Sequence, residues 1–287
     1  MIEGGGASAP QRRLRAELRG ARRACGLTQE QAANEMDWSL SKIIRIETGS
    51  VGITANDLIG LLRLYRITEP EQTNSLLGLA AAARERSWWS AYRDIAPSSL
   101  LRLIDYESAA SVIRQFELTF IPGILQTEEY ARAVIQDYYD EGSRSERLGG
   151  LVQLRVRRED LLNSENSPSF QFILDEAAVR RIVGRPSVMR RQLERLIQWA
   201  DQPNITLRLI PFTAGLHPGV KGAFEIIEFT DHNADEIVFL ESPRGDIITD
   251  DPEITLTYRE AFEGLVASSL DSQGSLARLG EIMNEIL

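Results

Sequence analysis

Hydrophobic residues recur at helical spacing through the first third of the chain. Between residues 28 and 49 they predict two short helices, with apolar positions at Ala32, Ala33 and Met36 in the first and at Leu40, Ile43, Ile44 and Ile46 in the second. Thr28 and Ser39 each precede a helix, where a side-chain oxygen accepts an orphan backbone N–H. Gln31 stands three residues after Thr28, which is the spacing of a capping box. Gly49 predicts the end of the second helix.

Further helices flank this pair. A strongly basic helix is expected before it, and a helix capped near Thr54 after it, with inward positions at Leu58, Leu61, Leu62 and Tyr65. Residues 69–85 form another amphipathic stretch. We therefore expect a disordered lead-in at residues 1–10, an all-α unit of five helices at residues 11–84, and a junction at residues 85–100 that contains Trp88 and Trp89.

The pattern changes after about residue 101. Strand-like runs occur near residues 112–118, 169–175, 204–212, 222–229 and 236–242, and helical patterns alternate with them. Residues 101–287 are therefore expected to form an α+β or α/β domain with about five strands. The last helix has apolar positions at Leu276, Leu279, Ile282, Met283 and Ile286. A core role for this helix is favoured over a dimer seam, which stays open.

Charge is distributed unevenly along the chain, which carries a formal net charge of −10. Residues 1–84 hold 11 basic and 9 acidic side chains, and the remainder holds 21 and 33. The basic side chains of the first helix are Arg12, Arg13, Arg15, Arg19, Arg22 and Arg23. A helix with so many basic side chains is typical of a surface that binds nucleic acid, so each arginine is expected either to approach a phosphate or to belong to a solvated helix face. A nearly neutral single unit binds DNA weakly, so tight binding implies a dimer.

The patterns T-Q-E-x-A-A and S-x-S-K-I-x-R-x-E-x-G make residues 13–66 resemble the helix-turn-helix domain of the lambda-repressor/XRE family. The resemblance implies that Ser39, Ser41, Lys42 and Arg45 contact DNA bases, and that Gln29 approaches a phosphate or an adjacent base. It also implies that Glu47 ties the second helix of the pair to the rest of the domain.

Each of these contacts has an alternative. Ser39 is an N-cap, a base contact or both, and Lys42 and Arg45 have ordinary solvated charges as their alternative. Trp38, in the turn, is either a packing residue or an apolar contact to a sugar or a thymine methyl group.

The second part of the chain also resembles a known group. F-I-P-G-I-L-Q-T-E-E-Y-A-R-A-V at 120–134, R-R-E-D-L-L at 157–162, F-I-L-D-E-A-A-V-R-R at 172–181, G-L-H-P-G-V-K-G-A-F at 215–224 and F-L-E-S at 239–242 are similar to the C-terminal domain of actinomycete XRE-type regulators, sometimes described as antitoxin-like. That resemblance implies a small partner protein encoded nearby. The use of 30 arginines against Lys42 and Lys221 fits GC-rich coding.

The composition and motifs of the chain give little support for an enzyme. The chain has two histidines and one cysteine, and it lacks Walker, G-x-G-x-x-G and G-x-S-x-G motifs. We therefore expect no enzyme, no cofactor and no metal. Asp175 and Glu176 follow a strand and are either acids at a helix N-terminus or contacts to a ligand or partner. His217, in a loop between strands, is a third candidate contact of that kind.

These observations favour a cytoplasmic, nucleoid-associated transcriptional regulator. It would bind a double-stranded operator as a homodimer, while its C-terminal domain receives a partner or ligand. The alternative is an antitoxin-like protein that sequesters a small partner and autoregulates its own operon. No run of about 18 apolar residues suggests a membrane span.

Overall fold

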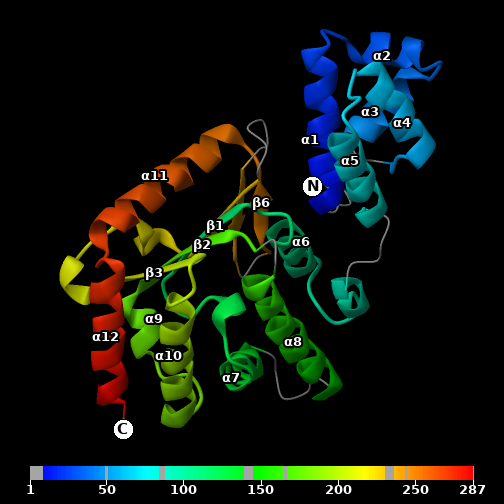
Figure 1. Ribbon diagram of the computed structural model, residues 1–287. Helices are drawn as coiled ribbons and strands as arrows, with labels where there is room; N and C mark the ends of the chain where they lie inside the picture. The colour runs from blue at the N-terminus through cyan, green and yellow to red at the C-terminus, as the bar shows by residue number, and fades with distance from the viewer. Residues whose placement is uncertain are drawn as a thin grey trace. The chain divides into compact units, whose positions relative to one another are not determined.

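The computed structural model describes residues 9–48, 51–83, 88–138, 145–164, 167–229, 236–242 and 245–286. The chain forms two compact units, one made mainly of residues 1–88 and the other mainly of residues 89–287 (Figure 1). The expected helix end at Gly49 and most of the expected lead-in lie outside the described residues, as do residues 85–87 of the expected junction. Each unit is considered by itself below.

The described part of the N-terminal unit holds five helices, as predicted. They are α1 (Ala9–Ala24), α2 (Gln29–Glu35), α3 (Leu40–Thr48), α4 (Ala55–Leu64) and α5 (Pro70–Ala82). The capping box between Thr28 and Gln31 is confirmed, since each side chain accepts a hydrogen bond from the other residue's backbone N–H. Thr54 likewise caps α4 by accepting from the N–H of Asp57. The predicted inward positions of α4 are all buried in the unit's core.

The predicted apolar side of α3 is only half right. Ile43 and Ile46 are buried, but Leu40 and Ile44 are 42% and 37% exposed. The helical spacing explains the error, because at 100° per residue these four positions span an arc of about 160°, and the core covers only the part of it that holds Ile43 and Ile46. Two of them must therefore share the exposed side with polar residues.

Three helices of this unit end in the same hydrogen-bonded turn. After α2, the N–H of Asp37 donates to the carbonyl of Asn34 and that of Trp38 donates to Ala33, which is a Schellman motif. Gly26 occupies the left-handed position after α1, but Asp37 and Arg66 occupy it after α2 and α4, with φ of 54° and 59°. Trp38 packs partly buried against the core just after this turn.

The C-terminal unit is built on a mixed sheet with the strand order β3-β2-β1-β4-β5-β6. Its strands are β1 (Val112–Glu117), β2 (Ser169–Asp175), β3 (Ile205–Ile210), β4 (Phe224–Glu228), β5 (Ile237–Leu240) and β6 (Ile247–Thr249). Strands β1, β2 and β3 are parallel, and β4, β5 and β6 continue the sheet in antiparallel pairs. The expected domain of mixed α and β structure, given as α+β or α/β, is confirmed, with six strands in the described residues instead of about five.

Helices cover both faces of this sheet (Figure 1). The helices of the unit are α6 (Ser98–Glu107), α7 (Glu128–Tyr138), α8 (Ser145–Arg158), α9 (Glu176–Arg180), α10 (Pro186–Ala200), α11 (Pro252–Ser268) and α12 (Ser272–Glu285). One core joins the sheet to α7, α10 and α12, and a second joins the opposite face to α11. Coverage of both faces fits the apolar residues that β2 carries on its two sides, since Phe172 belongs to the first core and Ile173 to the second.

The last helix belongs to the first of these cores. Leu279 and Ile282 are almost fully buried in it, and Leu276, Met283 and Ile286 pack against it partly buried. The predicted role of α12 as a core helix is therefore confirmed within a single chain. None of the helices in the described residues is long and apolar enough to cross a membrane.

Candidate functional site

The predicted DNA contacts lie along the α2-turn-α3 segment, with Gln29 at the start of α2, Ser39 directly before α3, and Ser41, Lys42 and Arg45 within α3. Ser39 stands directly before α3, and its hydroxyl accepts a hydrogen bond from the N–H of Lys42 at 3.2 Å. The capping role of Ser39 is thus confirmed, and the side chain remains exposed. Its base contact stays a prediction.

A buried ionic network fixes the inner side of α3. Glu47 accepts two hydrogen bonds from the Arg22 guanidinium, at 2.7 and 3.0 Å, and a third from the Gln29 amide at 2.8 Å. The hydrogen bond from Arg22 to Glu47 raises the pKa of that guanidinium, although burial acts in the opposite sense. Arg22 also donates to the carbonyl of Leu27. The expected structural role of Glu47 is confirmed, and the network joins α1, α2 and α3.

This network changes the interpretation of two expected DNA contacts. Gln29 is half-buried, and its amide N–H is used by Glu47. Arg22 is only 8% exposed, so it supports the fold instead of reaching a phosphate. Among the other arginines of α1, Arg13 and Arg23 are exposed and Arg15 and Arg19 are half-buried. The side chain of Arg12 lies outside the described residues.

The outward face of α3 carries Ser41 and Arg45, which are both exposed. They stand four residues apart, so they lie one above the other on the helix. The ammonium group of Lys42 lies 3.2 Å from Asp57 of α4 and 3.6 Å from the centroid of the Trp38 ring. The structure therefore places Ser41 and Arg45 together on one face, and it holds Lys42 beside α4.

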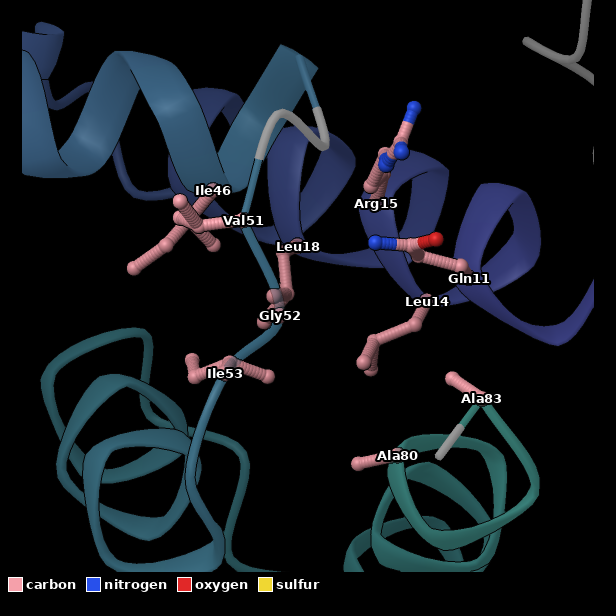
Figure 2. A pocket seen from close by; sticks show the side chains of 10 residues that line it. All are labelled: Gln11, Leu14, Arg15, Leu18, Ile46, Val51, Gly52, Ile53, Ala80 and Ala83. Atoms are coloured by element: carbon pink, nitrogen blue, oxygen red, sulfur yellow. The ribbon is translucent and has the colours of Figure 1, made fainter. Parts of the chain in front are cut away.

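A hollow in the same unit lies away from this face. It is lined by Gln11, Leu14, Arg15 and Leu18 of α1, by Ile46, by Val51, Gly52 and Ile53, and by Ala80 and Ala83 (Figure 2). It meets α3 only at Ile46, which belongs to the buried side. Most of the residues that line this hollow belong to the core of the five-helix unit. The hollow therefore results from the way α1 packs on the other helices.

The three candidate contacts of the C-terminal unit lie together. Asp175 ends β2 and caps α9, accepting from the N–H of Ala177 at 2.7 Å. Its second oxygen lies 3.1 Å from Nε2 of His217, whose Nδ1 accepts the N–H of Gly219 at 3.2 Å. Because Nδ1 accepts, Nε2 carries the ring proton and donates to Asp175. Both side chains are buried.

Glu176 is the centre of a second set of contacts beside this pair. Its side chain is 1% exposed and accepts from Arg180 at 2.5 Å, from Arg278 at 2.7 Å and from the N–H of Phe212 at 3.1 Å. Burial alone would raise the pKa of Glu176, but these hydrogen bonds lower it below its usual value. Asp175, Glu176 and His217 therefore brace the loop between β3 and β4.

The braced loop displays large apolar side chains to solvent. Phe212, Leu216 and Val220 are 59%, 88% and 49% exposed. Sequence reasoning selected His217 of this loop as a contact and passed over its apolar residues. The run Leu216-His217-Pro218-Gly219-Val220 gave a signal, since both of its branched apolar residues flank Pro-Gly turn chemistry.

A buried charged cluster of the same unit also escaped the sequence reasoning. Arg158 of α8 donates to both oxygens of Glu107 of α6, at 2.5 and 3.1 Å, and both side chains are buried. Glu225 of β4 is 2% exposed, and its Oε1 has no hydrogen-bond partner among the described residues. Burial, with the charge of Glu107, raises its pKa well above the usual value. Burial likewise raises the pKa of Glu117 to about 8.

The geometry defines a helix-turn-helix protein with a separate α/β domain, and comparison with known families agrees. Residues 13–76 match a helix-turn-helix domain, which supports a DNA-binding regulator. Residues 100–281 match the domain of unknown function DUF5753, and the chain belongs to that family. No curated protein matches the chain.

Proposed function

We propose that this protein is a sequence-specific transcriptional regulator that reads DNA with the outward face of α3. The observation that carries the proposal is the division of α3 into two sides. Glu47 holds the inner side through Arg22 and Gln29, while Ser41 and Arg45 remain exposed on the outer side. A helix held in this way presents a preorganised surface to the major groove.

Within this proposal the predicted contacts have different roles. Arg45 binds a base edge, as arginine does most often at guanine, and Ser41 and Ser39 contact bases or phosphates near the start of the helix. Lys42 stays with Asp57 and Trp38, and Gln29 stays with Glu47, so both position α3 from its flanks. The protein binds as a homodimer to two half-sites about one helical turn apart, because a single nearly neutral unit binds weakly.

Selection of bound sequences from a random duplex library tests this proposal. We expect the full chain to select a two-fold symmetric motif, and Arg45→Ala to lose the preference at one base pair of each half-site. Arg190→Ala is the matched control, because it removes one exposed arginine from α10 of the other unit. A library that yields no motif with the full chain would refute the proposal, and so would a motif unchanged by Arg45→Ala.

A second candidate function is capture of a small partner protein, with DNA binding used for autoregulation. The observation that favours it is the loop of Phe212, Leu216 and Val220, because a braced loop that exposes three large apolar side chains is typical of an interaction surface. Co-expression with the product of the adjacent gene tests it. Leu216→Asp should abolish co-purification, and Leu256→Asp, at an exposed leucine of α11, should leave it intact.

A further inference from the structure

Two apolar side chains of α3 face solvent beside the predicted DNA contacts. Leu40 and Ile44 are 42% and 37% exposed, although the core of the unit closes over Ile43 and Ile46 of the same helix. They stand four residues apart and so form one row along the helix. Both members of the row are exposed, so the exposed apolar surface extends over two positions of the helix.

This apolar row lies directly beside the row of Ser41 and Arg45. In an α-helix successive residues turn by 100°, so positions 40, 44, 41 and 45 follow one another across a continuous arc of about 140°. All four of these side chains are exposed. Lys42 falls outside that arc, toward Asp57 of α4. One half of the outward face is therefore apolar, and the other half carries a hydroxyl and a guanidinium group.

The major groove offers a specific match to such a face. The C5-methyl group of thymine is the one apolar feature among the base edges there, and it is read by apolar side chains. We propose that Leu40 and Ile44 read thymine methyl groups next to the base pair that Arg45 contacts. This inference rests on the proposed DNA-binding function and adds to it a class of base, because it requires thymine within each half-site.

A contact between protein copies explains the exposed row less well. A stable interface buries about 1,200–2,000 Å² in total, and two half-exposed side chains supply a small part of that area. Such a contact would also cover Ser41 and Arg45, which share the same face. It is nevertheless an outcome that the experiment below detects.

Replacing thymine by deoxyuridine in the selected operator tests the inference. The substitution removes the methyl group and leaves the hydrogen-bonding edge of the base unchanged. For the full chain we expect each contacted methyl group to contribute about fourfold in affinity. In Leu40→Ala or Ile44→Ala the same replacement should have no effect at the thymine which that side chain reads. Deoxyuridine outside the half-sites is the DNA control, and Leu256→Ala is the protein control.

The outcomes separate this inference from the function on which it rests. A selected motif whose affinity is indifferent to deoxyuridine at every thymine would overturn the inference and leave the regulator proposal standing. The absence of any selected motif would overturn both. If Leu40→Ala and Ile44→Ala convert a dimer to a monomer in sedimentation, the row serves association between copies, and the inference is wrong.

Discussion

The two units bury charge in different ways. In the N-terminal unit Arg22, Gln29 and Glu47 satisfy one another, and the network fixes the helix that bears the predicted DNA contacts. In the C-terminal unit the pair of Arg158 and Glu107 has excess carboxyls near it, and the pKa of two of these, Glu225 and Glu117, is raised by burial.

The network of the N-terminal unit holds one helix in a fixed position, whereas the stability of the C-terminal unit depends on the protonation of its buried carboxyls. A complete ionic network holds its geometry because each buried charge in it has an opposite partner. A buried carboxyl without a partner is stable only while it keeps its proton. The predictions below test this comparison, from the largest expected effect to the smallest.

Breaking either buried pair should give the largest loss of stability. We expect Arg158→Ala and Glu47→Ala each to cost about 3–5 kcal/mol, because each leaves an opposite charge buried without a partner. Hydrogen exchange read segment by segment should show the loss in the mutated unit. Arg157→Ala and Glu30→Ala are controls, since both residues are exposed. Equal effects in variant and control would contradict the assignment.

Replacing Glu225, whose Oε1 has no hydrogen-bond partner among the described residues, should have the opposite effect on stability. We expect Glu225→Gln to stabilise the C-terminal unit by about 1–3 kcal/mol at pH 8, because the amide cannot ionise in a buried site. Thermal unfolding at pH 8 and pH 5 checks this prediction, and the gain should shrink at pH 5. Glu260→Gln, at an exposed carboxyl of α11, serves as the control. A loss of stability at pH 8 would show that ionised Glu225 is held by a partner.

The raised pKa of Glu117 predicts a pH dependence of stability. The folded chain holds this proton up to about pH 8, whereas the ordinary pKa of the group is 4.5. Between these values the folded state binds more protons than the unfolded state, so stability falls as pH rises, by at most about 1.4 kcal/mol per pH unit. Denaturant titrations at several pH values between 5 and 8 give the free energy of unfolding at each pH. This free energy should fall less steeply with pH in Glu117→Gln than in the original chain. An equal fall in both proteins would refute the prediction.

The smallest expected effect concerns the turns that end α2 and α4. Arg66 and Asp37 hold left-handed backbone conformations that glycine adopts without steric cost. Arg66→Gly should therefore stabilise the N-terminal unit by up to about 1 kcal/mol. Asp37→Gly should gain less, because aspartate tolerates this conformation better. Thermal unfolding of the two variants gives the comparison, and a larger gain at Asp37 would contradict it.

Much of the N-terminal unit could be predicted because its signals are local. Thr28, Gln31 and Thr54 mark helix starts within three residues of the groups they bind. The ends of α2 and α4 carried no such mark, because Asp37 and Arg66 stand where glycine usually announces the turn. Leu40 and Ile44 were assigned to the wrong side, since the pattern shows how many apolar residues a helix has and not which of them the core accepts.

The C-terminal unit was harder because its decisive contacts are distant in sequence. The apolar runs identified β1 to β5, but β6 has only three residues and was missed. The partners of Arg158 and His217 stand 51 and 42 residues away, so no local spacing announces them. Charged residues are usually exposed, which is why the burial of Glu107, Arg158 and Glu225 could not be anticipated.

The central claim, that α3 reads bases with its outward face while its flanks hold it in place, is tested most directly by comparing Arg45→Ala with Lys42→Ala. Affinities are measured for the selected operator and for each single base-pair variant of one half-site. We predict that Arg45→Ala loses about 1–3 kcal/mol of discrimination at one base pair. Lys42→Ala should keep the full pattern of preferences. Loss of discrimination in Lys42→Ala, with the pattern intact in Arg45→Ala, would contradict the account.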